Sequence, residues 1–264
     1  ELWRARGYPG VTPISRKLLE HWAGTADPRE DRMLFCQREA AETAIYLAEV
    51  AGRKGEPDIR PRLDDANRIH NAGLHRVALK MATGSGKTIV MAMLIAWQTI
   101  NKVHAPRDTR FSKRFLIVTP GITIRDRLRV LQPSEPDNYY RQRDLIPADL
   151  WHALDEAQIV ITNYHTFLLR DALDIGGTHR VDARQVLGLL VDRVGLPAIP
   201  AAIYAHPDDG DHRERDTVPA GMRQDGHAVL LFLAIPLVLR CTCVYGYRHP
   251  SPLEAEGYHE WRTG

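Results

Sequence analysis

The chain has 264 residues, 44% of them apolar and 26% charged, as expected for a globular protein with one large or two small domains. Its formal net charge of +2 gives no sign of nucleic-acid binding by itself. Three cysteines are too few and too poorly spaced for a disulfide framework, which favours a reducing cytoplasm. No signal peptide is visible, and the chain opens with Glu1 rather than methionine, so we expect a fragment boundary there.

The first half of the chain shows a regular succession of elements. Residues 30–52 predict an amphipathic helix that ends at Gly52. Residues 53–74 are charged, contain two prolines and have no period, so we expect a solvated loop or insertion. Residues 76–82 predict a buried strand. Residues 88–99 predict a helix that is apolar nearly all round and therefore covered on both sides.

Two more strands follow. Residues 114–120 predict a second buried strand that ends at a Pro-Gly turn, and residues 123–131 read as helical. A short helix is expected to begin near Pro147, and residues 158–170 start as a third buried strand. Strand, glycine turn, helix, strand, helix, strand is typical of a parallel sheet with crossover helices. We therefore predict an α/β fold.

Residues 171–264 differ in character, being rich in Gly, Pro, His, Asp and Arg with little sustained periodicity. They suggest one helix over 181–195 and one further element over 228–239. The latter is the longest apolar run, but it is too short to span a bilayer and contains Pro236, so we expect a buried strand or helix and no membrane contact. This part of the chain is interpreted as divergent, truncated or read from a shifted frame.

A glycine-rich segment, ATGSGKT (82–88), lies between the first predicted strand and its helix. Backbone N–H groups in such a turn, together with the positive end of the helix dipole, suit a phosphate. Lys87 would neutralise the β- and γ-phosphate oxygens and the Thr88 hydroxyl would help to hold Mg²⁺. A glycine turn without a ligand is the alternative. The candidate nucleotide-binding residues are Thr83, Gly84, Ser85, Gly86, Lys87 and Thr88, with Lys87 and Thr88 as the catalytic candidates.

The segment departs from the usual G-x-x-x-x-G-K-[ST] pattern because Met81 stands where the first glycine is expected. The variant is that of many helicase-type ATPases. Residues 20–170 resemble the first motor domain of superfamily 2 helicases, most closely the restriction subunit of type III restriction enzymes. ATGSGKT matches the first helicase motif, MLFCQREAAE is similar to the upstream glutamine motif, and FLIVTPGITIRDRL and IVITNYHTF resemble the next two motifs.

This resemblance implies a P-loop (RecA-like) parallel sheet with helices on both faces, and ATP and Mg²⁺ as cofactors. It implies double-stranded DNA and a modification (methyltransferase) subunit as partners. Gln37 would pair with adenine N7 and N6, because an amide can donate and accept at once. The alternative is that Gln37 lies on a solvated helix face.

The two later motifs imply contacts with the nucleic-acid backbone. Thr119, Pro120 and Gly121 follow the second strand, at the end where open α/β sheets bind ligands. The Thr119 hydroxyl and the Gly121 amide would contact DNA phosphates, with Arg125 and Arg127 adding positive charge. The alternative is a simple Pro-Gly turn with solvated arginines.

Thr162 and Asn163 take a similar place at the end of the third strand, with an ordinary turn as their alternative.

Two further patterns resemble metal-binding motifs, but neither is assigned as a site. Asp155 and Glu156 in LDEAQIV spell an acidic Mg²⁺ motif, but that motif needs a strand before the aspartate, whereas here a helix precedes and the strand follows. We expect both side chains to be solvated. The stretch 203–213 resembles the metal motif of zinc-dependent sugar deacetylases, but it lies too near the end of the chain, so a polar loop is favoured.

We therefore divide the chain into an N-terminal extension (1–29), a partial RecA-like ATP-binding domain (30–170) and an unassigned part (171–264). The expected function is that of an ATP-driven DNA motor of a restriction system. No acidic motif, second motor domain or nuclease centre is recognised, so this stretch alone is expected to turn over little ATP. A kinase-like or regulatory P-loop module that is not a motor is the alternative, and a deacetylase a third possibility.

Overall fold

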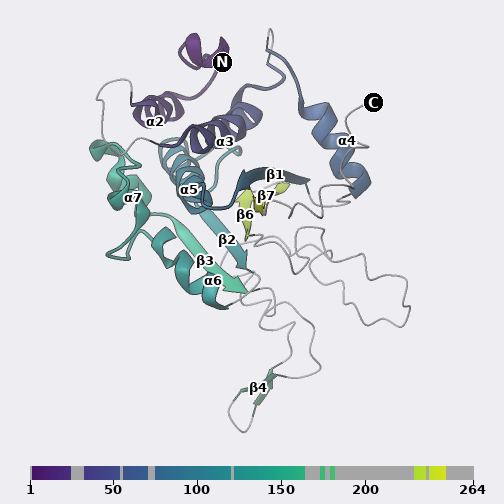
Figure 1. The fold of residues 1–264 in the computed structure, drawn as a ribbon, viewed down its shortest axis with the longest axis vertical. Helices are drawn as coiled ribbons and strands as arrows, with labels where there is room; N and C mark the ends of the chain where they lie inside the picture. The colour runs from purple at the N-terminus through teal and green to yellow at the C-terminus, as the bar shows by residue number, and fades with distance from the viewer. Residues whose placement is uncertain are drawn as a thin grey trace, which may run out of the picture.

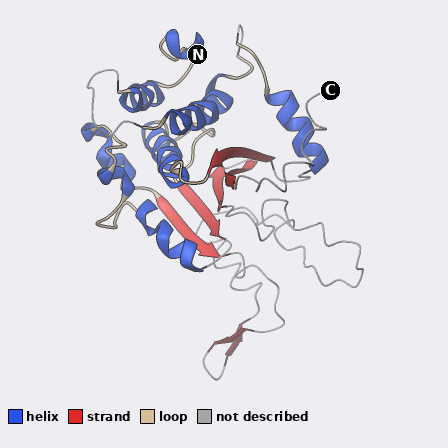
Figure 2. Cartoon of the chain, viewed as in Figure 1, coloured by secondary structure: helices blue, strands red, loops and turns tan. Residues whose placement is uncertain are grey.

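A computed structural model describes residues 2–24, 33–53, 56–70, 75–119, 122–163, 173–175, 179–181, 229–235 and 238–247. Figures 1 and 2 show the arrangement of its elements. The helices are α1 (Leu2–Ala5), α2 (Pro13–Ala23), α3 (Phe35–Ile45), α4 (Arg60–His70), α5 (Lys87–His104), α6 (Ile122–Arg127), α7 (Tyr139–Gln142) and α8 (Trp151–Leu154). A π-helical turn, η1 (Tyr46–Val50), continues α3, and the 3-10 turns are η2 (Leu128–Leu131) and η3 (Ala148–Leu150). The strands are β1 (His75–Ala82), β2 (Arg114–Thr119), β3 (Gln158–Asn163), β4 (Leu173–Ile175), β5 (His179–Val181), β6 (Val229–Ile235) and β7 (Val238–Tyr247).

The main sheet has five strands in the order β1-β7-β6-β2-β3. β1 pairs in parallel with β7, and β2 pairs in parallel with β3. β6 is antiparallel to both of its neighbours, β7 and β2, so the other four strands share one direction. The α/β fold is confirmed, and β1, β2 and β3 point the same way, but the predicted all-parallel sheet is corrected to a mixed one.

The antiparallel strand has a simple physical origin. The apolar run 228–239, predicted as a single element, contains the whole of β6 and the first two residues of β7, with two residues between the strands. A parallel connection needs a crossover of a dozen residues or more, so a link of two residues leaves only a hairpin. A separate two-stranded antiparallel sheet joins β4 and β5.

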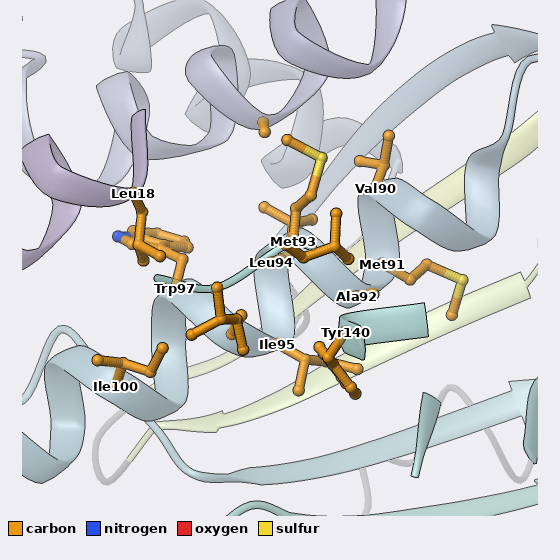
Figure 3. Packing of buried hydrophobic residues seen from close by; sticks show 14 of the residues in the cluster. Leu18, Val90, Met91, Ala92, Met93, Leu94, Ile95, Trp97, Ile100 and Tyr140 are labelled. Carbon is orange, nitrogen blue, oxygen red and sulfur yellow. The ribbon is translucent and has the colours of Figure 1, made fainter. Parts of the chain in front are cut away.

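Helix α5 forms the centre of the core, as its apolar sequence predicts. Every residue from Val90 to Asn101 is buried. α5 contacts α2, α3, α7 and α8 as well as strand β7. Figure 3 shows Leu18 of α2 beside Trp97 of α5, with Ile95 next to Tyr140 of α7. The helix that follows the glycine-rich turn is therefore held firmly by the rest of the fold.

The strands present one face to this core. Leu79 and Met81 of β1 are buried in the same cluster as Phe115 and Ile117 of β2, and the partly buried Ile159 and Ile161 of β3 pack against it. On β1 the alternate residues Ala78, Lys80 and Ala82 are exposed. Since side chains alternate across a strand, the core helices of the described residues share one face of the sheet. The predicted buried strand is thus buried on one of its two faces.

Residues 2–24 belong to the same core. Leu18, Leu19 and Trp22 of α2 are buried in the cluster that contains α5, and the Trp22 indole N–H donates to the Leu145 carbonyl at 2.8 Å. The helix begins with a Thr12 side-chain cap and Pro13 in its first turn, a favourable start. The segment predicted as an N-terminal extension therefore packs as an integral part of the domain.

The solvated loop predicted for 53–74 is also corrected, because helix α4 occupies residues 60–70 of it. Pro61 lies in the first turn, where proline is tolerated, and the Asp58 carboxylate accepts from the Arg60 N–H at 3.1 Å. The helix is mostly exposed and carries few apolar residues, so it leaves no apolar period in the sequence.

The predicted helix over 181–195 and the deacetylase-like stretch 203–213 lie outside the described residues, apart from Val181 at the end of β5. None of the described helices has the length and apolar character needed to cross a membrane.

Candidate functional site

The four strands that share one direction, β1, β7, β2 and β3, end at the same edge of the main sheet, and three of them lead to predicted site residues. β1 ends at Ala82, β2 at Thr119 and β3 at Asn163, and all three run in one direction. We call this the carboxyl edge. β7 and β6 separate β1 from β2, so the two strands are about 14 Å apart across the sheet at about 4.8 Å per strand. Their registers place Val118 level with Ala78, so β1 continues three residues beyond the level at which β2 ends. The glycine-rich segment and both predicted nucleic-acid segments therefore begin at one edge.

The glycine-rich segment is a tight turn closed on one carbonyl. The Ala82 carbonyl accepts from the Ser85 hydroxyl at 2.7 Å and from the Ser85 N–H at 3.4 Å. Gly84 and Gly86 have φ angles of 80° and 75°, in the left-handed region that glycine adopts without strain. Gly84 also has open space where a side chain would lie. The sequence therefore needs glycine at both positions to make this turn.

Lys87 is the first residue of α5, and its ammonium donates to the Ala82 carbonyl at 3.0 Å. Burial lowers the pKa of this ammonium from the ordinary lysine value. Because it is partly stripped of water, the cation loses less hydration on meeting an anion than an exposed lysine does. Thr88, the next residue, is half-buried in the same first turn.

The turn fits a phosphate by its chemistry. Gly86 precedes α5 and has no side chain with which to cap it, so the first N–H groups of α5 receive no cap from that position. Ala82, Thr83 and Gly84 are exposed at the mouth of the turn. A helix start with its positive dipole end and a lysine beside it is a suitable environment for a polyphosphate.

Gln37 is 3% exposed, so the alternative that it lies on a solvated helix face is wrong. Its Oε1 accepts from the Leu34 N–H at 3.0 Å, which caps the start of α3. Its Nε2 donates to the Ser85 carbonyl at 3.0 Å. The two ends of the amide therefore join α3 to the glycine-rich turn, a contact that the sequence did not predict.

The strand-end residues lie side by side. In the β2–β3 register Thr119 is paired with Asn163 and Val118 with Thr162, as expected for neighbouring strand ends. The Thr119 side chain has none of its surface exposed, and its hydroxyl donates to the Thr162 carbonyl at 3.3 Å. In this arrangement the Thr119 hydroxyl joins the two strand ends, and the geometry does not support its predicted contact with DNA. Pro120 and Gly121 lie outside the described residues.

Two arginines follow on α6. Arg125 forms an ion pair with its neighbour Asp126 at 3.0 Å, so part of its charge is compensated locally. Arg127 is exposed at the end of the same helix. The positive charge predicted for this segment is therefore most accessible at Arg127.

Asp155 and Glu156 lie at the opposite edge of the sheet. They form an exposed turn after α8, immediately before β3 begins at Gln158, and Glu156 forms an ion pair with Lys113 at 2.6 Å. Since β3 spans six residues, about 17 Å separates its two ends at about 3.3 Å per residue. Neither carboxylate can reach a metal ion beside Thr88, as the order of helix and strand predicts.

One known protein family matches the part of the chain that contains these elements. The family described as type III restriction enzyme, res subunit, matches residues 32–187, which is more than half of the chain. The chain belongs to this family. The match begins five residues before Gln37, contains the glycine-rich turn and the strands β1, β2 and β3, and confirms the resemblance seen in the sequence.

Membership of the res-subunit family places the chain among ATP-dependent, helicase-like proteins, and it indicates use of a nucleotide and contact with DNA. No curated protein and no solved structure is significantly similar to the chain.

We expect Asp155→Asn and Glu156→Gln to leave ATP affinity and its Mg²⁺ dependence within about twofold of wild type, because both are surface changes remote from the turn. Thr88→Ala is the matched contrast and should raise the Mg²⁺ concentration required. Titration calorimetry at several Mg²⁺ concentrations measures both quantities. A marked loss of Mg²⁺ dependence in Asp155→Asn would contradict this assignment.

Proposed function

We propose that this chain is the nucleotide-binding half of an ATP-driven motor that moves along double-stranded DNA in a restriction system. Membership of the res-subunit family supports the proposal at the level of the superfamily. The observation that carries it further is the place of Lys87, on the first turn of α5, at the edge where β2 and β3 also end.

Each residue of the glycine-rich turn has its own proposed role in binding Mg²⁺–ATP. Lys87 would exchange the Ala82 carbonyl for the β- and γ-phosphates, and the N–H groups from Gly84 to Lys87 would surround the β-phosphate. Thr88 would offer its hydroxyl to Mg²⁺, which neutralises phosphate charge when bound. Thr83 and Ser85 would shape the turn, and Gln37 would give its remaining donor and acceptor to adenine.

The nucleic-acid contacts are proposed for the neighbouring strand ends. The Gly121 N–H would donate to a DNA phosphate, and Thr162 and Asn163 would contribute from the neighbouring strand end. Arg125 and Arg127 would add positive charge, and Pro120 would shape the turn that precedes them. Phosphate contacts of this kind position DNA without reading its sequence.

Hydrolysis in such motors also needs a group that positions the attacking water and an arginine that stabilises the transition state. We expect both from parts of the protein other than the described residues. A methyltransferase subunit is proposed as a partner by the same family argument.

The test uses the full-length protein and measures ATP hydrolysis with and without double-stranded DNA. A motor gives a rate that rises when DNA is added and that falls at higher salt, because phosphate contacts weaken with ionic strength. A nucleotide-binding module that is not a motor hydrolyses or binds ATP to the same extent with and without DNA. That second outcome would overturn the proposal while leaving the nucleotide site intact.

A further inference from the structure

The contact between Gln37 and the turn has a consequence for the backbone of the turn itself. Only one orientation of the Gln37 amide satisfies both of its partners, since the Leu34 N–H needs an acceptor and the Ser85 carbonyl needs a donor. The orientation of this buried side chain is therefore determined by its surroundings.

The Ser85 carbonyl belongs to the peptide whose nitrogen is that of Gly86. No described peptide bond is cis, and in a trans peptide the C=O and the N–H point in opposite directions. When Gln37 holds the Ser85 carbonyl towards α3, the Gly86 N–H must point away from α3. The hydrogen bond from Gln37 at 3.0 Å, with a weaker one from the Cys36 thiol of the same helix at 4.0 Å, thus sets the direction of a donor in the turn that surrounds the proposed phosphate.

Position 86 requires glycine for this contact. A Cβ atom at Gly86 would lie 2.2 Å from Gln37 Nε2, well inside contact distance. The φ angle of 75° adds a second reason for glycine, since other residues adopt it only with strain. The turn and the Gln37 amide therefore fit each other only because position 86 has no side chain.

We propose that Gln37 is a positioning residue for the phosphate-binding turn and orients the Gly86 N–H towards the polyphosphate, independently of any contact with the base. This inference rests on the proposed nucleotide site. It separates two roles for one side chain: a residue that reads only adenine affects nucleotides alone, whereas a residue that orients the turn also affects a polyphosphate without a base.

The test compares Mg²⁺–ATP with Mg²⁺–tripolyphosphate, which has no base, by titration calorimetry of the full-length protein. Gln37→Met removes the hydrogen bonds and keeps a similar volume. We expect both ligands to bind about fivefold more weakly, the factor that corresponds to one lost hydrogen bond. Loss of ATP affinity with unchanged tripolyphosphate affinity would overturn the inference and leave Gln37 as a reader of adenine.

A second measurement needs no variant at position 37. In wild-type protein labelled with ¹⁵N-glycine, the Gly86 amide signal, assigned by its disappearance in Gly86→Ala, should shift when tripolyphosphate is added. An unchanged Gly86 signal at saturating tripolyphosphate also overturns the inference, even where Gln37→Met fails to fold.

These outcomes remain distinct from failure of the proposed function. If wild-type protein binds neither ATP nor tripolyphosphate, the nucleotide site itself is wrong and the inference falls with it. If wild-type protein binds both ligands while the Gly86 signal or the Gln37→Met affinities fail the expectation, only the positioning role is lost. A lower melting temperature with unchanged affinities identifies a purely structural role and contradicts the inference.

Discussion

Lys87→Ala is expected to weaken ATP binding by the full-length protein by roughly a hundredfold, or about 3 kcal/mol. The substitution removes the cation on the first turn of α5, which burial has already stripped of part of its water. Alanine is a good helix former, so α5 itself should stay intact. Titration calorimetry with Mg²⁺–ATP measures the loss, and thermal unfolding shows that the protein remains folded.

Two further variants serve as controls for the Lys87→Ala experiment. Lys80→Ala removes another lysine only two residues before Ala82, from the exposed face of β1, and should leave ATP affinity within about twofold of wild type. Lys87→Arg keeps the charge but presents a broader group, so it should recover only part of the affinity. Wild-type ATP affinity in Lys87→Ala would remove the basis of the proposed nucleotide site.

Glu49→Ala is expected to lower the free energy of unfolding by about 3–5 kcal/mol, the largest effect on stability that we predict. Glu49 lies in the π-helical turn η1 and is 3% exposed. Its carboxylate accepts from the Thr12 N–H at 2.7 Å, from the Trp97 indole N–H at 2.8 Å and from the Ser15 hydroxyl. Removing the acceptor would deprive three donors on two separate segments, the start of α2 and the middle of α5, of a partner.

The matched variants for this prediction differ in what they retain. Glu49→Gln keeps one oxygen for Trp97 and Ser15 but presents an NH₂ group to the Thr12 N–H, so a loss of about 1–2 kcal/mol is expected. Glu20→Ala, on the exposed face of α2, should change stability by less than about 0.5 kcal/mol. Urea unfolding followed by tryptophan fluorescence measures all three. Equal stability of Glu49→Ala and Glu20→Ala would contradict the proposed importance of this buried cluster.

The Glu49 cluster also explains why residues 2–24 are inseparable from the domain. Ser15 and Thr12 come from the start of α2, Glu49 from the end of the α3–η1 helix, and Trp97 from α5. Trp97 lies ten residues beyond Lys87 on the same helix, about 15 Å along its axis. The N-terminal segment thus helps to hold the helix whose first turn forms the candidate site.

Local patterns in the sequence were enough to predict the elements next to the site. The change from β1 to the glycine-rich turn and then to α5 depends on residues adjacent in the chain, and so does the order of helix and strand around Asp155. The α/β class and the family resemblance followed from the same short stretches. These features are encoded by periodicity and by the backbone freedom of glycine, which act over a few residues.

Contacts between distant segments were beyond reach of such patterns. Strands β7 and β6 separate β1 from β2 in the sheet. Both come from residues more than a hundred positions away from β1 and from β2, and no sequence pattern near β1 predicts them as its neighbours. The burial of Gln37 depends on how α3 meets the turn at Ser85. The acceptance of three donors by Glu49 depends on how α2, η1 and α5 converge.

Short-range backbone and side-chain preferences were enough to predict the class of fold, the glycine-rich turn and the strand ends at its edge of the sheet. The order of the strands, the single face on which the core helices pack, and the partners of Gln37, Thr119 and Glu49 depend on tertiary contacts. Burial and hydrogen bonding between segments far apart in the chain depend on where the whole fold brings them, and no local pattern records that position.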